Sequence, residues 1–169
     1  GEKAVVEIAE RLRNGEDIRY LDHIRGTAVV RGDAQGLDHA VTIPSFEAVQ
    51  GDYARFNEAF KIAYEESDPI RGKTVVQQHG DRFVVQFPPA LPLESRELDR
   101  IYELPYARTW HPVYDKQGGV PGFATVRFSI ISHRGCAGEC NFCSLFAHQG
   151  RIVQSRSQES ILKEVRLLA

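Results

Sequence analysis

Apolar residues recur at intervals of three and four positions in three stretches of the chain, and this spacing predicts amphipathic helices. The stretches are residues 2–14, which Gly15 ends, residues 52–66, and a final one from about residue 158, where Ser157 is suited to cap the helix. The side chains expected to face the core are Val5, Ile8, Ala9 and Leu12 in the first helix, Phe56, Ala59, Phe60 and Ala63 in the second, and Ile161, Leu162, Val165 and Leu168 in the third.

β-Branched and aromatic residues gather in four short runs, at residues 26–31, 73–78, 82–87 and 126–131, and each run predicts a strand. Residues 79–81, His-Gly-Asp, form a glycine-containing turn between the second and third runs, which favours a hairpin. The alternation of helical and extended patterns predicts a mixed α/β fold.

Prolines and glycines divide the chain. Pro88, Pro89 and Pro92 predict a stiff connector, and a short helix is expected at residues 95–103. Residues 104–122 are rich in Pro, Gly and aromatics and are interpreted as a bridge, so the predicted domains are residues 1–122 and 123–169. The chain begins at Gly1 and contains no methionine, so we expect it to be an internal piece of a longer protein.

The composition is that of a soluble globular protein. Twenty-one basic and 23 acidic residues give a net charge of −2, which predicts no general attraction to nucleic acid or to a membrane surface. No apolar run is long enough to span a bilayer, and no signal peptide opens the chain, so a cytoplasmic location is expected.

The chemistry of the chain lies in three cysteines, Cys136, Cys140 and Cys143, spaced as Cys-x-x-x-Cys-x-x-Cys. In a reducing compartment clustered thiols indicate metal or redox chemistry rather than disulfides. Thiolates are soft ligands that suit iron–sulfur clusters, and three of them in one short loop can hold three corners of a [4Fe–4S] cluster and leave the fourth iron open.

The residues around the cysteines fit this interpretation. Gly135 and Gly138 allow a tight loop that brings backbone amides toward the cluster sulfides. Phe142 precedes the last thiolate and is expected to shield the cluster or flank an adenine ring. Two alternatives stay open from the residues alone: a zinc site completed by His133 or His148, and a redox-active dithiol at Cys140 and Cys143.

The motif Cys-x-x-x-Cys-x-aromatic-Cys, placed after a predicted strand, resembles the signature of radical S-adenosylmethionine (SAM) enzymes. The similarity is closer to the YgiQ-like radical SAM proteins. It covers nearly the whole chain and is carried by segments 24–27, 68–72, 88–92, 102–108, 128–130, 133–136 and 148–157.

This resemblance implies that the parent protein holds a [4Fe–4S] cluster on Cys136, Cys140 and Cys143 and binds SAM at the open iron. An electron donor would then drive cleavage of SAM to a 5′-deoxyadenosyl radical that acts on an unknown substrate. It further implies that the chain joins the latter part of an N-terminal region to the first strand, loop and helix of a partial (β/α) barrel. The alternative is a catalytically silent structural or interaction fragment.

The late arginines allow two interpretations. Arg127, Arg134, Arg151 and Arg156 gather in and around the cysteine segment. Arg151 and Arg156 either form structural salt bridges or contact an anionic ligand such as the SAM carboxylate or the substrate.

Overall fold

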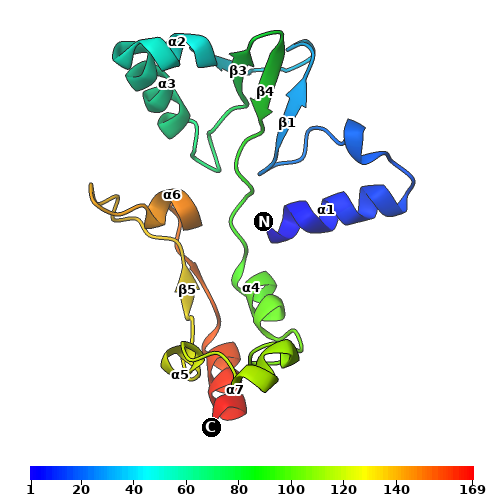
Figure 1. Cartoon of the computed structure of the whole chain (residues 1–169), viewed down its shortest axis with the longest axis vertical. Coiled ribbons are helices and arrows are strands. Elements are labelled where there is room, and N and C mark those ends of the chain that lie inside the picture. The colour runs from blue at the N-terminus through cyan, green and yellow to red at the C-terminus, as the bar shows by residue number, and fades with distance from the viewer. The chain divides into compact units, whose positions relative to one another are not determined.

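The computed structural model describes residues 1–169 and divides them into two units, Gly1–Leu91 and Pro92–Ala169 (Figure 1). Its α-helices are α1 (Glu2–Arg13), α2 (Phe46–Gly51), α3 (Tyr53–Glu65), α4 (Ser95–Tyr102), α5 (Phe123–Val126), α6 (Leu145–Gln149) and α7 (Gln158–Leu168), with 3-10 turns at Ile18–Tyr20 and Pro112–Gln117. Its strands are β1 (Ala28–Arg31), β2 (Val41–Ile43), β3 (Val75–His79), β4 (Arg82–Gln86), β5 (His133–Arg134) and β6 (Gln154–Ser155). The predicted mixed α/β class is confirmed, and no barrel is closed. None of the helices combines the length and the apolar character needed to cross a membrane.

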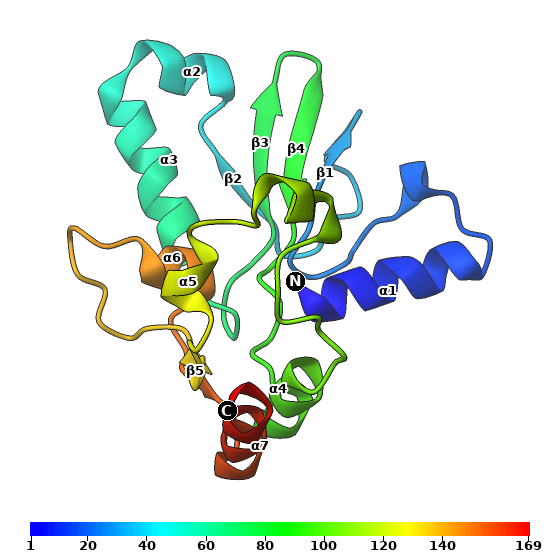
Figure 2. The same cartoon turned by 60° about the horizontal axis from the view of Figure 1, so that its bottom comes forward.

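The first unit is organised by a four-stranded sheet in the order β1-β4-β3-β2, whose strands lie side by side in Figure 2. The predicted hairpin is confirmed: β3 and β4 pair antiparallel, and His79 pairs with Arg82 across the two-residue turn Gly80-Asp81. Gly80 has φ +58°, the left-handed conformation that such turns need. Strand β2 pairs parallel to β3, with α2 and α3 in the crossover between them.

The core of the first unit lies against this sheet. Val76, Val85 and Phe87 are buried together. A second cluster joins Ala4 of α1 to Leu21 and Ile24. The two helices predicted at residues 2–14 and 52–66 form as α1 and α3. Their buried faces differ from the prediction, because α1 buries Ala4 and in α3 only Ala59 is buried.

In the second unit two predicted helices, α4 and α7, form with local caps. Glu94 and Glu97 make a capping box at the start of α4, and the hydroxyl of Ser157 accepts the Ser160 amide at 3.1 Å at the start of α7. Leu98 of α4 is fully buried. The buried face of α7 is formed by Ser160 and Glu164, not by the predicted apolar residues.

The prediction of a strand at residues 126–131 is wrong. Val126 is the last residue of helix α5, and the chain is irregular from there to the two-residue strand β5. Val126, Phe128 and Ile131 are 56%, 66% and 54% exposed. No strand pairs with this run, and β propensity does not hold a segment extended without ladder hydrogen bonds or a packed face. The domain boundary predicted at residue 122 concerns the parent protein and stays a prediction.

Candidate metal centre

The three cysteines lie in a loop whose two ends are held together; residues 136–150 are called the cysteine loop, and residues 131–135 with 151–156 the loop base. In the loop base β5 and β6 pair antiparallel, with His133 opposite Ser155. Above it the Cys136 amide donates to the carbonyl oxygen of Gly150 at 3.0 Å. The loop is therefore closed before the first thiol.

Gly135 makes this closure possible. Its φ is +85°, and a Cβ placed on it would lie 2.3 Å from the carbonyl oxygen of Ile152, far inside van der Waals contact. Only glycine allows the two backbones to approach so closely at that conformation. The tight loop predicted from Gly135 is present in this form.

Gly138 lies between the first two thiols. Its amide donates to the sulfur of Cys136 at 3.4 Å, and its carbonyl oxygen accepts the thiol of Cys140 at 3.8 Å. The Cys143 amide donates to the Cys140 carbonyl oxygen at 2.9 Å and closes a turn over the last thiol. An N–H group directed at a ligand sulfur is the kind of contact that tunes an iron–sulfur site.

The thiols are chemically available. Cys136 and Cys143 are half-buried, Cys140 is exposed, and none forms a disulfide. Their sulfurs do not converge: no three Cys, His, Asp or Glu side chains are arranged to hold one metal ion. His133 and His148, considered for a zinc site, do not complete such a group either. The donor set fits an iron–sulfur cluster, since three reduced soft ligands share one short loop, and ligation requires the loop to draw them together.

Phe142 points into solvent and is 93% exposed. It makes no aromatic contact with another ring. An exposed ring beside the last thiol is free to cover a bound group, so its predicted cofactor-binding role stays a prediction.

A salt bridge crosses the cysteine loop. Arg151 lies 3.0 Å from a carboxylate oxygen of Glu139, which has a positive φ of 44°, and Arg151 also lies over the Phe146 ring at 5.8 Å. The first of the two interpretations of Arg151, a structural ion pair, is the one seen.

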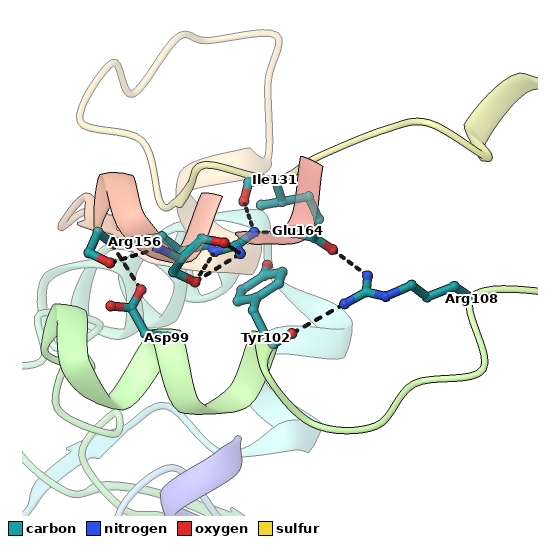
Figure 3. A network of polar contacts seen from close by, with 8 residues as sticks. Asp99, Tyr102, Arg108, Ile131, Arg156 and Glu164 are labelled. Carbon is teal, nitrogen blue, oxygen red and sulfur yellow. Dashed lines mark hydrogen bonds and ion pairs between the residues drawn. The ribbon is translucent and has the colours of Figure 1, made fainter. Parts of the chain in front are cut away.

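Arg156 is buried beneath the loop, with 1% of its side chain exposed. It forms an ion pair with Glu164, and its guanidinium lies 4.2 Å from the centre of the Tyr102 ring. Figure 3 shows Glu164 between Arg156 and Arg108, with the Tyr102 ring beside them. The salt-bridge interpretation of Arg156 is therefore the correct one.

Glu164 pairs with two arginines through its two carboxylate oxygens. Arg108 donates to one carboxylate oxygen at 2.5 Å, and Arg156 donates to the other. Burial disfavours the charged form of this carboxyl, but the hydrogen bonds from Arg156 and Arg108 outweigh that cost, and the pKa of Glu164 lies below its ordinary value. Sequence reasoning missed Glu164 and Arg108, because the apolar pattern of α7 pointed to a different face. The only available signal was the Ser160–Glu164 spacing of four, which puts both on one face.

Comparisons with known proteins place the chain among a group of relatives. A family model described as Radical SAM N-terminal matches residues 1–129. Proteins named UPF0313 from Clostridium botulinum (strain ATCC 19397 / Type A) and Methanocella arvoryzae are 50% and 51% identical over 168 residues, which is 99% of this chain and 26% and 28% of theirs. A UPF0313 protein from Clostridium perfringens (strain ATCC 13124) is 46% identical over 96% of this chain and 25% of its own length.

The chain thus spans about a quarter of the length of the curated relatives it matches. The family model ends before the cysteines, whereas the alignments to the two relatives at 50% and 51% identity run over 168 residues and so include the cysteine loop. No solved structure matches the chain.

Proposed function

The chain belongs to the Radical SAM N-terminal family, and on that premise we propose that it supplies the cluster-binding loop of a radical SAM enzyme. Its similarity to the YgiQ-like radical SAM proteins, predicted from the sequence, is confirmed by the family match and the UPF0313 relatives. The proposal rests above all on one observation: three reduced thiols, spaced Cys-x-x-x-Cys-x-x-Cys, in a loop closed at its base by paired backbone.

In this proposal Cys136, Cys140 and Cys143 are the three protein ligands of a [4Fe–4S] cluster. When bound, such a cluster supplies the electron that cleaves S-adenosylmethionine into methionine and a 5′-deoxyadenosyl radical. The chain's own residues hold the ligands: the Gly138 amide directs its N–H at the Cys136 sulfur, and Gly135 allows the loop to close. Phe142 is proposed to cover the bound cofactor, because its ring is exposed beside the last ligand.

The partners in this proposal are SAM, an electron donor and a substrate whose identity is open. Three free thiols suit a reducing compartment, so we place the protein in the cytoplasm. Residues 1–122 belong to the N-terminal region, and residues 123–169 begin the catalytic domain.

The test is anaerobic reconstitution of the full-length protein with iron and sulfide. We expect about four irons per chain and a broad absorbance near about 400 nm, as cubane iron–sulfur sites show. Replacing any one of Cys136, Cys140 and Cys143 with Ala should abolish both signals, because each ligand carries one corner of the cluster.

Ser144→Ala is the matched control, since this residue follows the last cysteine and its side chain makes no capping hydrogen bond. It should leave the iron content unchanged. A colourless protein with one zinc per chain would instead refute the proposal and favour the Cys₃His site. The 169-residue chain alone is expected to cleave little SAM, in line with its coverage of a quarter of the relatives.

A further inference from the structure

One residue joins the two segments of the loop base. Arg156, which follows β6, donates from Nη1 to the carbonyl oxygen of Ile131, which precedes β5, at 3.0 Å. Its backbone amide donates to the carbonyl oxygen of Ser132, also at 3.0 Å. The residues bridged in this way are 25 positions apart and flank all three thiols.

Every nitrogen of the Arg156 guanidinium is occupied. Nε and Nη2 donate to the Ser160 hydroxyl at 3.2 and 2.9 Å, Nη2 also donates to the Ser160 carbonyl oxygen at 3.0 Å, and Nη1 is shared between Ile131 and Glu164. A planar group with five fixed donors holds several acceptors in one geometry. Since the side chain is buried and all three of its nitrogens already donate hydrogen bonds, Arg156 is not in a position to bind a SAM carboxylate.

Glu164 keeps this cation buried at low cost. A buried arginine without a counter-charge is strongly unfavourable, and here the carboxylate is held by hydrogen bonds from two sides. Arg108, which lies 56 residues before Glu164 in the chain, donates the second of these hydrogen bonds. It also donates to the Tyr102 carbonyl oxygen at 3.5 Å. The loop base is thereby connected to the segment that follows α4.

Two side chains of helix α4, Asp99 and Tyr102, also contact the loop base and the start of α7. Asp99 accepts the Ser157 amide at 2.9 Å, next to Arg156 in the chain. Burial opposes the charge of Asp99, but its hydrogen bonds with Ser157 and Ser160 outweigh this effect and the pKa of its carboxyl is lowered. Two cations lie over the Tyr102 ring, Arg156 at 4.2 Å and Arg134 of β5 at 5.6 Å from its centre. Figure 3 shows Asp99 and Tyr102 directed from α4 toward this cluster.

We propose that Arg156, Glu164 and Arg108 act together as positioning residues that fix the loop base and so set where the three thiols are presented. This inference rests on the proposed function for the role of the thiols, but the fixing of the loop base can be measured without any cluster. The three residues do not touch the reacting groups; they act through the backbone of residues 131–136 and 150–156.

The first test is hydrogen–deuterium exchange of the metal-free full-length protein. The reporters are the amides of Cys136 and Arg156, whose hydrogen bonds close the loop and its base. Glu164→Gln preserves shape and removes the charge, and it should speed exchange at both amides by about tenfold or more, because a buried charge pair is broken. Arg156→Lys should do the same, since lysine keeps the charge but lacks the planar fork.

The matched control is Lys163→Gln, which removes a charge from the neighbouring position of α7, where Lys163 pairs with Glu103 at the surface. It should change exchange less than about twofold, because exposed pairs contribute little. The Val41 amide, bonded to Thr74 in the first unit, should stay unchanged in all variants. Equal exchange in Glu164→Gln and Lys163→Gln would overturn the proposal, and far-UV circular dichroism identifies any variant that fails to fold.

The second test reads the thiols themselves. After reconstitution, Glu164→Gln should shift or broaden the electron paramagnetic resonance signal of the reduced cluster relative to Lys163→Gln, and Glu164→Asp should restore part of the wild-type signal. An unaltered signal in Glu164→Gln would refute the positioning role. Failure of the wild-type protein to take up iron would refute the proposed function instead, and the exchange experiment would still decide whether the loop base is fixed by these residues.

Discussion

Gly135 gives the sharpest prediction about the cysteine loop. In Gly135→Ala the new Cβ would lie 2.3 Å from the Ile152 carbonyl oxygen, and a φ of +85° is strained for alanine whatever space it has. The clash is with backbone, so β5 and β6 must separate to relieve it. We therefore expect this variant to lose stability in the second unit and to loosen the loop at its entry.

The magnitude follows from the contacts. The unfavourable backbone conformation costs about 1–3 kcal/mol. Separating the strands also removes the hydrogen bond between Cys136 and Gly150, a further ~0.5–1.5 kcal/mol. Gly150→Ala provides the control, because Gly150 has φ +93° but no atom within 4 Å of its Cβ, so it bears the conformational cost alone. The difference between the two variants measures the clash together with the hydrogen bond lost through it, and we expect roughly 1–3 kcal/mol.

The assay is urea unfolding of the 169-residue chain followed by tryptophan fluorescence, since Trp110 is the only tryptophan and lies in the second unit. Gly138→Ala adds a second control. The φ of Gly138 is not positive, and its Cβ would make ordinary contacts with the Cys136 and Cys140 sulfurs at 3.4 and 3.5 Å. We therefore expect its free energy of unfolding to change by no more than about 0.5 kcal/mol. If Gly135→Ala is no less stable than Gly150→Ala, the close approach to Ile152 does not restrict this position and the reasoning fails.

Two further changes test other parts of the structure. Because the pKa of Glu164 is lowered, its stabilising effect is complete above its ordinary pKa of 4.5 and is lost as the pH falls through the folded-state pKa. The free energy of unfolding of Glu164→Gln should therefore fall less steeply than that of the wild type below about pH 4.5. If denaturant titrations give the wild type and Glu164→Gln the same dependence of the unfolding free energy on pH, this prediction is wrong. In the first unit, Gly72→Ala would place a Cβ 2.2 Å from the Glu66 carbonyl oxygen and should cost about 1–3 kcal/mol. Gly51→Ala, with open space around it, should cost less, and circular dichroism during urea unfolding compares the two.

Elements with complete local signals could be predicted from the sequence. The β3–β4 hairpin needs only two β-rich runs and a glycine in the turn, and Gly80 supplies it. Helix α7 needs an N-cap and a helical run, and Ser157 provides the cap. The cysteine motif is equally local, so its spacing identified the candidate metal centre.

What could not be predicted depends on partners far apart in the chain. The run at residues 126–131 has the side chains of a strand but finds no neighbouring strand, so its propensity does not decide its structure. The face of α7 follows Arg156 and Arg108, which pair with Glu164 across 8 and 56 positions. No apolar periodicity reports such a charge network. The direction of each thiol likewise depends on the folded loop and not on the spacing alone.

The position of Glu164 in the chain also has a consequence for biosynthesis. The ion pair that holds Arg156 in the loop base needs Glu164 of α7, and this helix is translated after all three cysteines. At about 5–20 residues per second, the ribosome exposes Cys143 roughly one to four seconds before Glu164 follows. During that interval the thiols lie in a nascent chain that lacks this ion pair. The complete set of contacts around the loop base therefore forms only when α7 has left the ribosome.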